Sequence, residues 1–167
     1  MSVINDYVNA DVAAGKKAVA LLSQGAELIV MIESFEVAAA DDNNSVYRVF
    51  KNVNPFYVPI KLDISCDAIT GMSDVNVGLY KNLEQGGAVI DDNVFGDAID
   101  LSSAVTRTVP KDGLKDVDLA NAEKTIWELA GDTLDEHDLG YDICLTAIAA
   151  ASTAGTILVV GHFAYKG

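Results

Sequence analysis

The sequence is poor in the residues on which several common classes of protein depend. It has two cysteines, three prolines, two histidines and one tryptophan among 167 residues. Two cysteines are too few for a disulfide scaffold or for a four-ligand zinc site. No apolar run approaches the ~20 residues that span a bilayer, and the apolar run after Lys16-Lys17 is too short for a signal peptide. We therefore predict synthesis and folding in a cytoplasm, no membrane partner, and free thiols at Cys66 and Cys144.

Basic residues are also scarce. Eleven lysines and arginines stand against 25 acidic residues, which gives a formal net charge of −14. Nucleic acids and anionic membranes are bound through basic patches, so we predict that neither is a partner. The stretch from Asp91 to Asp142 holds 14 acidic and four basic residues and thus carries −10 of the total. We interpret it as a solvated surface that keeps the protein soluble; a surface turned toward a basic partner is the alternative.

Signatures of catalysis and of metal binding are missing as well. The sequence has no Gly-x-Ser-x-Gly, no P-loop, no His-Glu-x-x-His and no Gly-x-Gly-x-x-Gly. His137 stands alone in an acidic loop without a second ligand at the required spacing, and His162 follows an apolar run that is typical of a core or an interface. We predict that the protein is not an enzyme and has no catalytic, cofactor-binding or metal-binding residues.

One loop comes near to a calcium-binding motif. The residues from Asp91 follow an EF-hand loop at positions one, three and six, but position five is Phe95 and position twelve is Ser102, where a bidentate Glu is required. The EF-hand interpretation therefore fails. A weak calcium site that uses Asp91, Asp92, Asn93 or Asp97 remains as an alternative.

Apolar residues make up 50% of the chain, and their spacing predicts strands. Residues 57–68 alternate, which is typical of a strand with one wet face; the predicted buried side chains are Val58, Ile60, Leu62, Ile64 and Cys66. Residues 75–79 alternate in the same way. Between 35–40 and 46–53, the polar residues 41–45 predict a hairpin turn.

Two apolar runs, residues 28–32 and 157–160, do not alternate. Continuous runs are typical of strands that are covered on both faces, whereas each strand of a lone two-sheet sandwich has one wet face. These two runs therefore require a further cover. A neighbouring copy would supply it in a homo-oligomer; loops or the N-terminal segment of the same chain are an equal alternative.

One helix is predicted, at residues 118–130, where apolar residues recur at three-and-four spacing. Asp116 or Asp118 can accept the first free N–H groups, and Gly131 stands where a left-handed C-cap is expected. We interpret Trp127 as an anchor that packs this helix on a sheet.

These patterns together predict an all-β fold, an antiparallel β-sandwich of about eight strands and jelly-roll type, with one short inserted helix. Residues 1–25 are less regular and predict an extended N-terminal arm, and residues 26–167 predict the β-sandwich domain.

Several strings of the sequence resemble, in this order, a family of small virion proteins of tailed bacteriophages that are taken to be capsid decoration, or cement, proteins. The strings are FEVAAADDNNSVYRVF (35–50), DAITGMSDVNVGLY (67–80), GAVIDDNVFGDAIDLSS (87–103), KDVDLANAEKTIWELAG (115–131), GYDICLTA (140–147) and AGTILV (154–159). The resemblance covers about residues 35–160. It implies a β-sandwich virion component without catalytic residues.

The resemblance implies a function on the outer surface of the head. There the protein would bind the major capsid protein and stabilise the expanded shell as a homo-oligomer, for example a trimer. We expect residues 1–25 to clamp a neighbour and the acidic segment to face away from the packaged genome. The alternative is a tail- or fibre-associated protein or adaptor, with a glycan-binding face as one form of it; the apolar setting of Trp127 counts against glycan binding.

Overall fold

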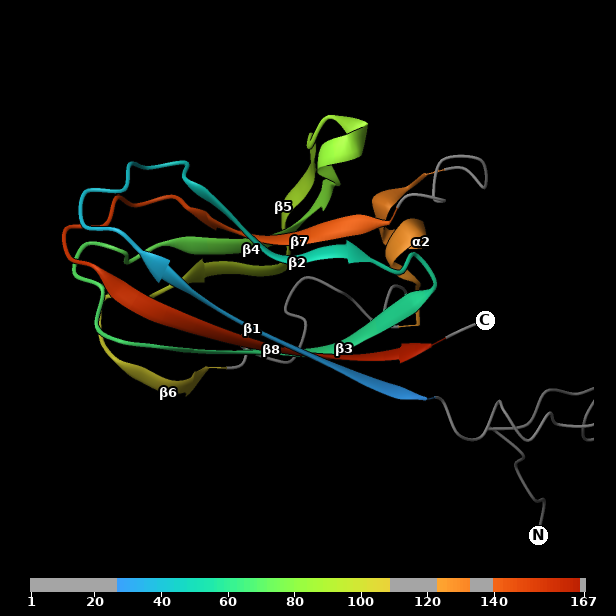
Figure 1. Ribbon diagram of the computed structural model, residues 1–167, viewed down its shortest axis with the longest axis horizontal. Helices are drawn as coiled ribbons and strands as arrows, with labels where there is room; N and C mark the ends of the chain where they lie inside the picture. Colours follow the sequence, from blue (N-terminus) through green and yellow to red (C-terminus); the bar gives the residue numbers. More distant parts are fainter. Residues whose placement is uncertain (1–26, 109–122, 133–139, 166–167) are drawn as a thin grey trace, which may run out of the picture.

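Strands dominate the computed structural model, which describes residues 27–108, 123–132 and 140–165 (Figure 1). The elements of this part are, in chain order, β1 (Leu28–Val37), β2 (Val46–Val53), β3 (Tyr57–Cys66), β4 (Val75–Lys81), η2 (Leu83–Gln85), β5 (Val89–Ile99), β6 (Val105–Thr108), α2 (Ile126–Ala130), β7 (Tyr141–Ala147) and β8 (Gly155–Tyr165). The strands form two four-stranded antiparallel sheets that lie face to face. The predicted all-β sandwich with an inserted helix is therefore confirmed.

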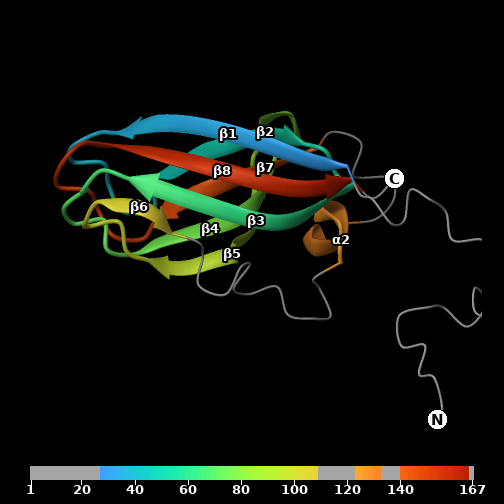
Figure 2. The ribbon, with the colours of Figure 1, turned by 90° about the horizontal axis from the view of Figure 1, so that it is seen from below.

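The two sheets have the strand orders β1-β8-β3-β6 and β2-β7-β4-β5. Figure 2 views the first sheet from outside, with its strands in that order. Apart from the β4–β5 hairpin, each connection between successive strands passes from one sheet to the other. β1 and β2 are consequently edge strands, and they lie on the same side of the sandwich (Figure 2). The jelly-roll class remains a prediction.

The predicted hairpin turn at residues 41–45 is wrong. β1 pairs with β8 and β2 pairs with β7, so the two strands that flank this loop belong to different sheets. The loop is held from outside: Ala40 N donates to Ala151 O at 3.0 Å, and Asn44 N donates to Ala147 O. A polar loop between two strands predicts a change of direction but not the strand with which each one pairs.

The core fills the space between the two sheets. Inward side chains of the first sheet, such as Ile64 and Val159, meet those of the second, such as Leu79, and all three are at most 1% exposed. Gly161 leaves room for two aromatic rings, because a Cβ there would lie 2.6 Å from Phe163 and 2.8 Å from Phe50. Those rings meet edge to face, with centroids 6.1 Å apart.

The alternation predicted for residues 57–68 is confirmed only in the second half of β3. Leu62, Ile64 and Cys66 are buried, but Ile60 is 49% exposed. A register shift between Pro59 and Lys61 inserts an extra residue opposite β8. Because such a bulge exchanges the two faces of a strand, the residues before it do not follow the pattern of those after it.

The helix is shorter than predicted. α2 begins at Ile126, and residues 123–125 are not helical. The first part of the predicted helix, residues 118–122, lies outside the described residues, as do the proposed caps Asp116 and Asp118. Thr125 and Glu128 form a capping box, which places the start of the helix later than the apolar spacing suggests. The predicted left-handed cap at Gly131 is confirmed, with φ 69°. Trp127 is half-buried and packs against the core.

Candidate interaction surface

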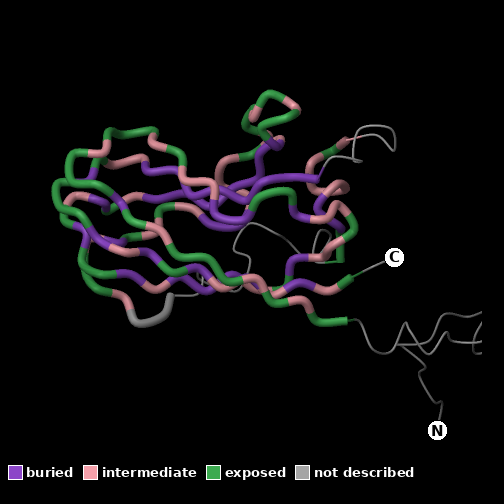
Figure 3. The backbone as a smooth tube through the Cα atoms, in the orientation of Figure 1, coloured by how far each residue is buried: buried purple, intermediate pink, exposed green. Residues whose placement is uncertain are grey.

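The outward side of β1 and β8 is apolar and lacks a cover among the described residues. Exposed fractions are 59% for Leu28, 49% for Val30, 64% for Ile32 and 38% for Leu158, while Val160 is half-buried. We call these five residues the outer apolar face. It coincides with the two continuous apolar runs of the sequence, and β1 is drawn largely as exposed in Figure 3.

Strand register explains why these residues gather. Ile32 lies opposite Val160, and Ser34 lies opposite Leu158, so side chains of the same parity on β1 and β8 share one face. The face becomes polar toward the end of β1, where Thr156 donates a hydrogen bond to Glu36. The described loops leave the apolar part uncovered. A neighbouring copy, the N-terminal segment and the loops outside the described residues therefore all remain as the covers predicted from sequence.

β3 borders this face with a small charged group. Lys61 Nζ lies 2.9 Å from Asp63 Oδ2, and Asp63 is only 8% exposed. His162 of β8 lies opposite Lys61; it is half-buried, and its Nδ1 is buried without a hydrogen-bond partner among the described residues. The core alternative for His162 is therefore wrong, and its place at an interface remains a prediction.

The pKa of Asp63 predicts a pH dependence of stability. Burial raises the pKa of this carboxyl above 3.8, against the opposing charge of His162. Between pH 3.8 and the raised pKa of the folded state, folded Asp63 still binds a proton that the unfolded chain has lost. As the pH rises through this range, the wild type should therefore lose stability relative to Asp63→Asn. Chemical denaturation of both proteins from about pH 3 to about pH 7 checks this. A pH-independent difference, or one of opposite slope, contradicts it.

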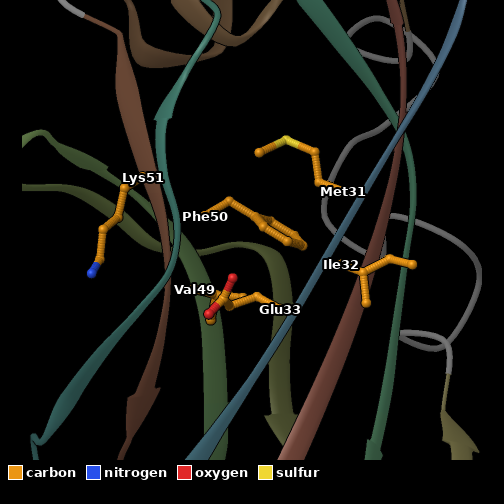
Figure 4. Close-up of a pocket in the computed structure, with 6 residues that line it drawn as sticks. All are labelled: Met31, Ile32, Glu33, Val49, Phe50 and Lys51. Carbon is orange, nitrogen blue, oxygen red and sulfur yellow. The ribbon is translucent and has the colours of Figure 1, made fainter.

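The sandwich is open between its edge strands β1 and β2. A cavity of about 390 Å³ lies there, lined by Met31, Ile32, Glu33, Val49, Phe50 and Lys51, and we call it the β1–β2 gap. In Figure 4 the side chains of Met31, Phe50 and Glu33 lie in the gap, whereas Lys51 points away from it. Val49 and Phe50, which line the gap, are each 3% exposed, and the exposed carboxylate of Glu33 lies beside them.

On the outward side of the second sheet, β5 passes close over Gly78 of β4, and the β4–β5 hairpin rises from the sheet in Figure 1. Arg48 of β2 forms an ion pair with Asp142 of β7 and donates to the carbonyl oxygens of Lys81 (3.2 Å) and Gly87 (3.0 Å), one at each end of the hairpin turn. Asn52 N also donates to Asp142, at 2.9 Å. Through these contacts, Arg48 and Asp142 attach the β4–β5 hairpin to the sheet.

Both cysteines are buried free thiols, as predicted for their redox state. Cys144 lies opposite Gly78 and Arg48, on the outward side of its sheet, and is nevertheless fully buried. Burial raises the pKa of the Cys144 thiol to about 12, with Arg48 opposing. Burial likewise raises the pKa of Cys66. Neither thiol has the character of a nucleophile.

The candidate calcium residues lie on β5. Asp91 and Asp92 line a hollow of about 610 Å³ beside Tyr80 and Thr146, whose hydroxyl oxygens are 2.6 Å apart. Asn93 N donates to Asp91 at 3.2 Å. Within the described ranges, no group of three or more His, Cys, Asp and Glu side chains could hold a metal ion. His137 lies outside the described residues.

One buried carboxylate was missed by the sequence analysis. Asp142, counted there among the solvated acids, is 2% exposed and paired with Arg48. The sequence signal for this burial was the position of Asp142 on a largely apolar strand, because a charge buried there requires a partner.

None of the described helices is long and apolar enough to cross a membrane.

Comparisons with known proteins bear on the fold. No protein-family model and no curated protein matches the sequence. A chain of the Cyanophage Pam1 capsid asymmetric unit is similar in structure, with a TM-score of 0.59 and 10% identity over 96% of this chain and 99% of that chain. A chain of the capsid of Ralstonia phage GP4 has a TM-score of 0.50 and 10% identity over 83% and 86%. The chain has a fold that occurs in phage capsids. At this identity the roles of individual residues are not transferred.

Proposed function

We propose that the protein is a structural component of a phage virion that decorates the outer surface of the head and stabilises its expanded form. The observation that carries this proposal is the similarity, along nearly the whole of both chains, to a chain of a phage capsid asymmetric unit. The sequence resemblance to decoration proteins supports the finer assignment. The same reasoning makes the protein a non-enzymatic component.

The distribution of charge and apolar surface fits such a component. The outer apolar face belongs to the sheet β1-β8-β3-β6, whereas Asp91, Asp92 and Asp97 are carried by β5 of the other sheet. A protein with a net charge of −14 associates with a like-charged copy most readily where no carboxylate is exposed. We propose that the outer apolar face makes subunit contacts in a homo-oligomer and that the acidic side faces away from the packaged genome.

Because binding sites repeat over a capsid lattice, individually weak contacts are sufficient for stable decoration. An interface of ~800 Å² per partner is of ordinary size, and an oligomer that bridges several copies of the major capsid protein gains avidity from each further contact. If only the expanded shell presents the complete site, binding stabilises that state by mass action. Residues 1–25 serve in this proposal as the arm that clamps a neighbour.

A charge on the outer apolar face should abolish assembly. Ile32→Lys places an ammonium group on a side chain that is 64% exposed, so the fold is kept while the contact loses apolar area and gains a charge. We expect light scattering to show a monomer and co-sedimentation with purified expanded heads to weaken at least tenfold, which is ~1.4 kcal/mol.

Leu83→Lys in η2 is the matched control, because Leu83 is 68% exposed and lies on the other sheet's hairpin. It should leave both mass and head binding unchanged. A wild-type protein that is monomeric, or that sediments with tails and not with heads, would overturn the decoration assignment in favour of the tail or fibre alternative.

A further inference from the structure

The free edge of β1 is available to an additional strand. β1 pairs with β8 over ten residues without a register shift and pairs with no other described strand. Natural edge strands are commonly protected by proline, by charged side chains (lysine above all, or charges that point inward), by bulges or by short length. Of these devices β1 has only the charges of Glu33 and Glu36. β1 has neither proline nor lysine, and its edge borders the β1–β2 gap with Phe50 as a wall.

Glu33 restricts which strand can be added. It shares the inward parity of Ile29 and Met31, its carboxylate lies in the gap, and it takes part in no ion pair between described residues (Figure 4). β1 also carries Glu36 and no basic residue. Pairing two β1 strands would therefore bring like charges together, whereas a strand with a lysine would complement Glu33.

The chain contains one segment with the required chemistry. Lys16-Lys17 is the sequence's only pair of adjacent lysines, and five apolar residues follow it, Ala18 to Leu22. Residues 1–26, which lie outside the described residues, hold two acidic and two basic side chains, so the whole net charge of −14 falls on the remainder. This neutral segment can approach the acidic body of a second copy without repulsion.

We propose that residues 17–22 of a neighbouring copy add to β1 as an antiparallel strand and close the β1–β2 gap. Pairing Lys17 with Glu33 sets the register and also sorts the other side chains. The inward positions receive larger apolar side chains and the outward positions mostly alanine: Val19 and Leu21 inward; Ala18, Ala20 and Leu22 outward. The inward pair then faces Phe50, and the alanines lie beside Ile32, where a larger side chain would obstruct contact.

A segment supplied by a neighbouring copy accounts for more of the exposed surface around β1 than a segment supplied by the same chain. Residues 23–27 could return the segment onto its own β1, which would cover the edge but leave the outer apolar face bare. A second copy that delivers its segment also brings a folded body next to that face. The inference thus rests on the proposed homo-oligomer, whose contacts it specifies.

Disulfide trapping between full-length copies tests this register. Copies with Ala20→Cys are mixed with tagged copies with Val30→Cys, since these positions oppose one another in the proposed register, and a mild oxidant is added. We expect a covalent pair with the mass of one untagged and one tagged chain. Tagged Glu84→Cys, exposed on η2, is the matched control and should give none. Native Cys66 and Cys144 are buried, so wild-type chains should stay uncoupled.

The remaining outcomes decide against the proposal. Absence of the mixed pair overturns strand addition. A chain with both substitutions that closes only within itself overturns the neighbouring copy in favour of its own chain. Lys17→Glu and Glu33→Lys should each lower the yield of the mixed pair at least threefold, and their combination should restore it. Cross-linking yields that do not change with these charges would overturn the register. Head co-sedimentation is measured separately, so heads bound without cross-linking contradict only this inference.

Discussion

Replacing Arg48 with methionine should lower the free energy of unfolding by about 3–5 kcal/mol, the usual cost of breaking a buried ion pair from one side. Asp142 is 2% exposed and would keep its charge without a cation to balance it. The carbonyl oxygens of Lys81 and Gly87 would lose their guanidinium donor at the same time, and the ring of Tyr80 would lose the cation 5.9 Å from its centre. The β4–β5 hairpin would therefore loosen along with the sheet.

Urea denaturation of full-length protein measures this loss directly. Lys81→Met is the matched control, because Lys81 is 33% exposed and lies 3.9 Å from Asp132, so its removal should change stability by no more than about 1 kcal/mol. Arg48→Met combined with Asp142→Leu should recover most of the lost stability, since no unpaired charge remains. An effect of Arg48→Met as small as that of Lys81→Met would mean that the pair is solvated.

Gly78→Ala should be the next most damaging substitution, at the upper end of the roughly 1–3 kcal/mol that overpacking costs. A Cβ at this position would lie 2.3 Å from Asp92 C and 2.4 Å from Asp91 O. Both are backbone atoms of β5, which cannot move aside as a flexible side chain would. β5 would have to lift away from β4, and its register, already shifted between Val77 and Leu79, would be lost.

Gly86→Ala separates this contact from a general effect of removing glycine. A Cβ at Gly86 has nothing within 4 Å, so only the left-handed backbone, with φ 88°, is unfavourable, at about 1 kcal/mol. The prediction requires Gly78→Ala to cost more than Gly86→Ala in the same denaturation assay. Hydrogen exchange should also rise along β5 in the Gly78 variant only; equal costs with unchanged exchange would contradict the close approach.

The candidate surface was partly predictable from sequence. The runs 28–32 and 157–160 were singled out because they did not alternate, and their outward residues form the outer apolar face. The β1–β2 gap was not predictable, since Phe50 and Glu33 are distant in sequence and meet only because two edge strands fall on one side. For Asp142, its apolar neighbours signalled burial, but Arg48 as its partner is 94 residues away.

Local sequence determined the features of this protein that depend on neighbours along the chain. The β class follows from period-two alternation, and the end of α2 follows from Gly131. Tertiary structure alone decided which strands pair, because register is set by side chains brought together across sheets. It thereby overturned the 41–45 hairpin, exchanged the two faces of β3 at the bulge between Pro59 and Lys61, and laid β5 over Gly78. Pairing order left β1 at an edge with its apolar side exposed, and the proposed contacts begin there.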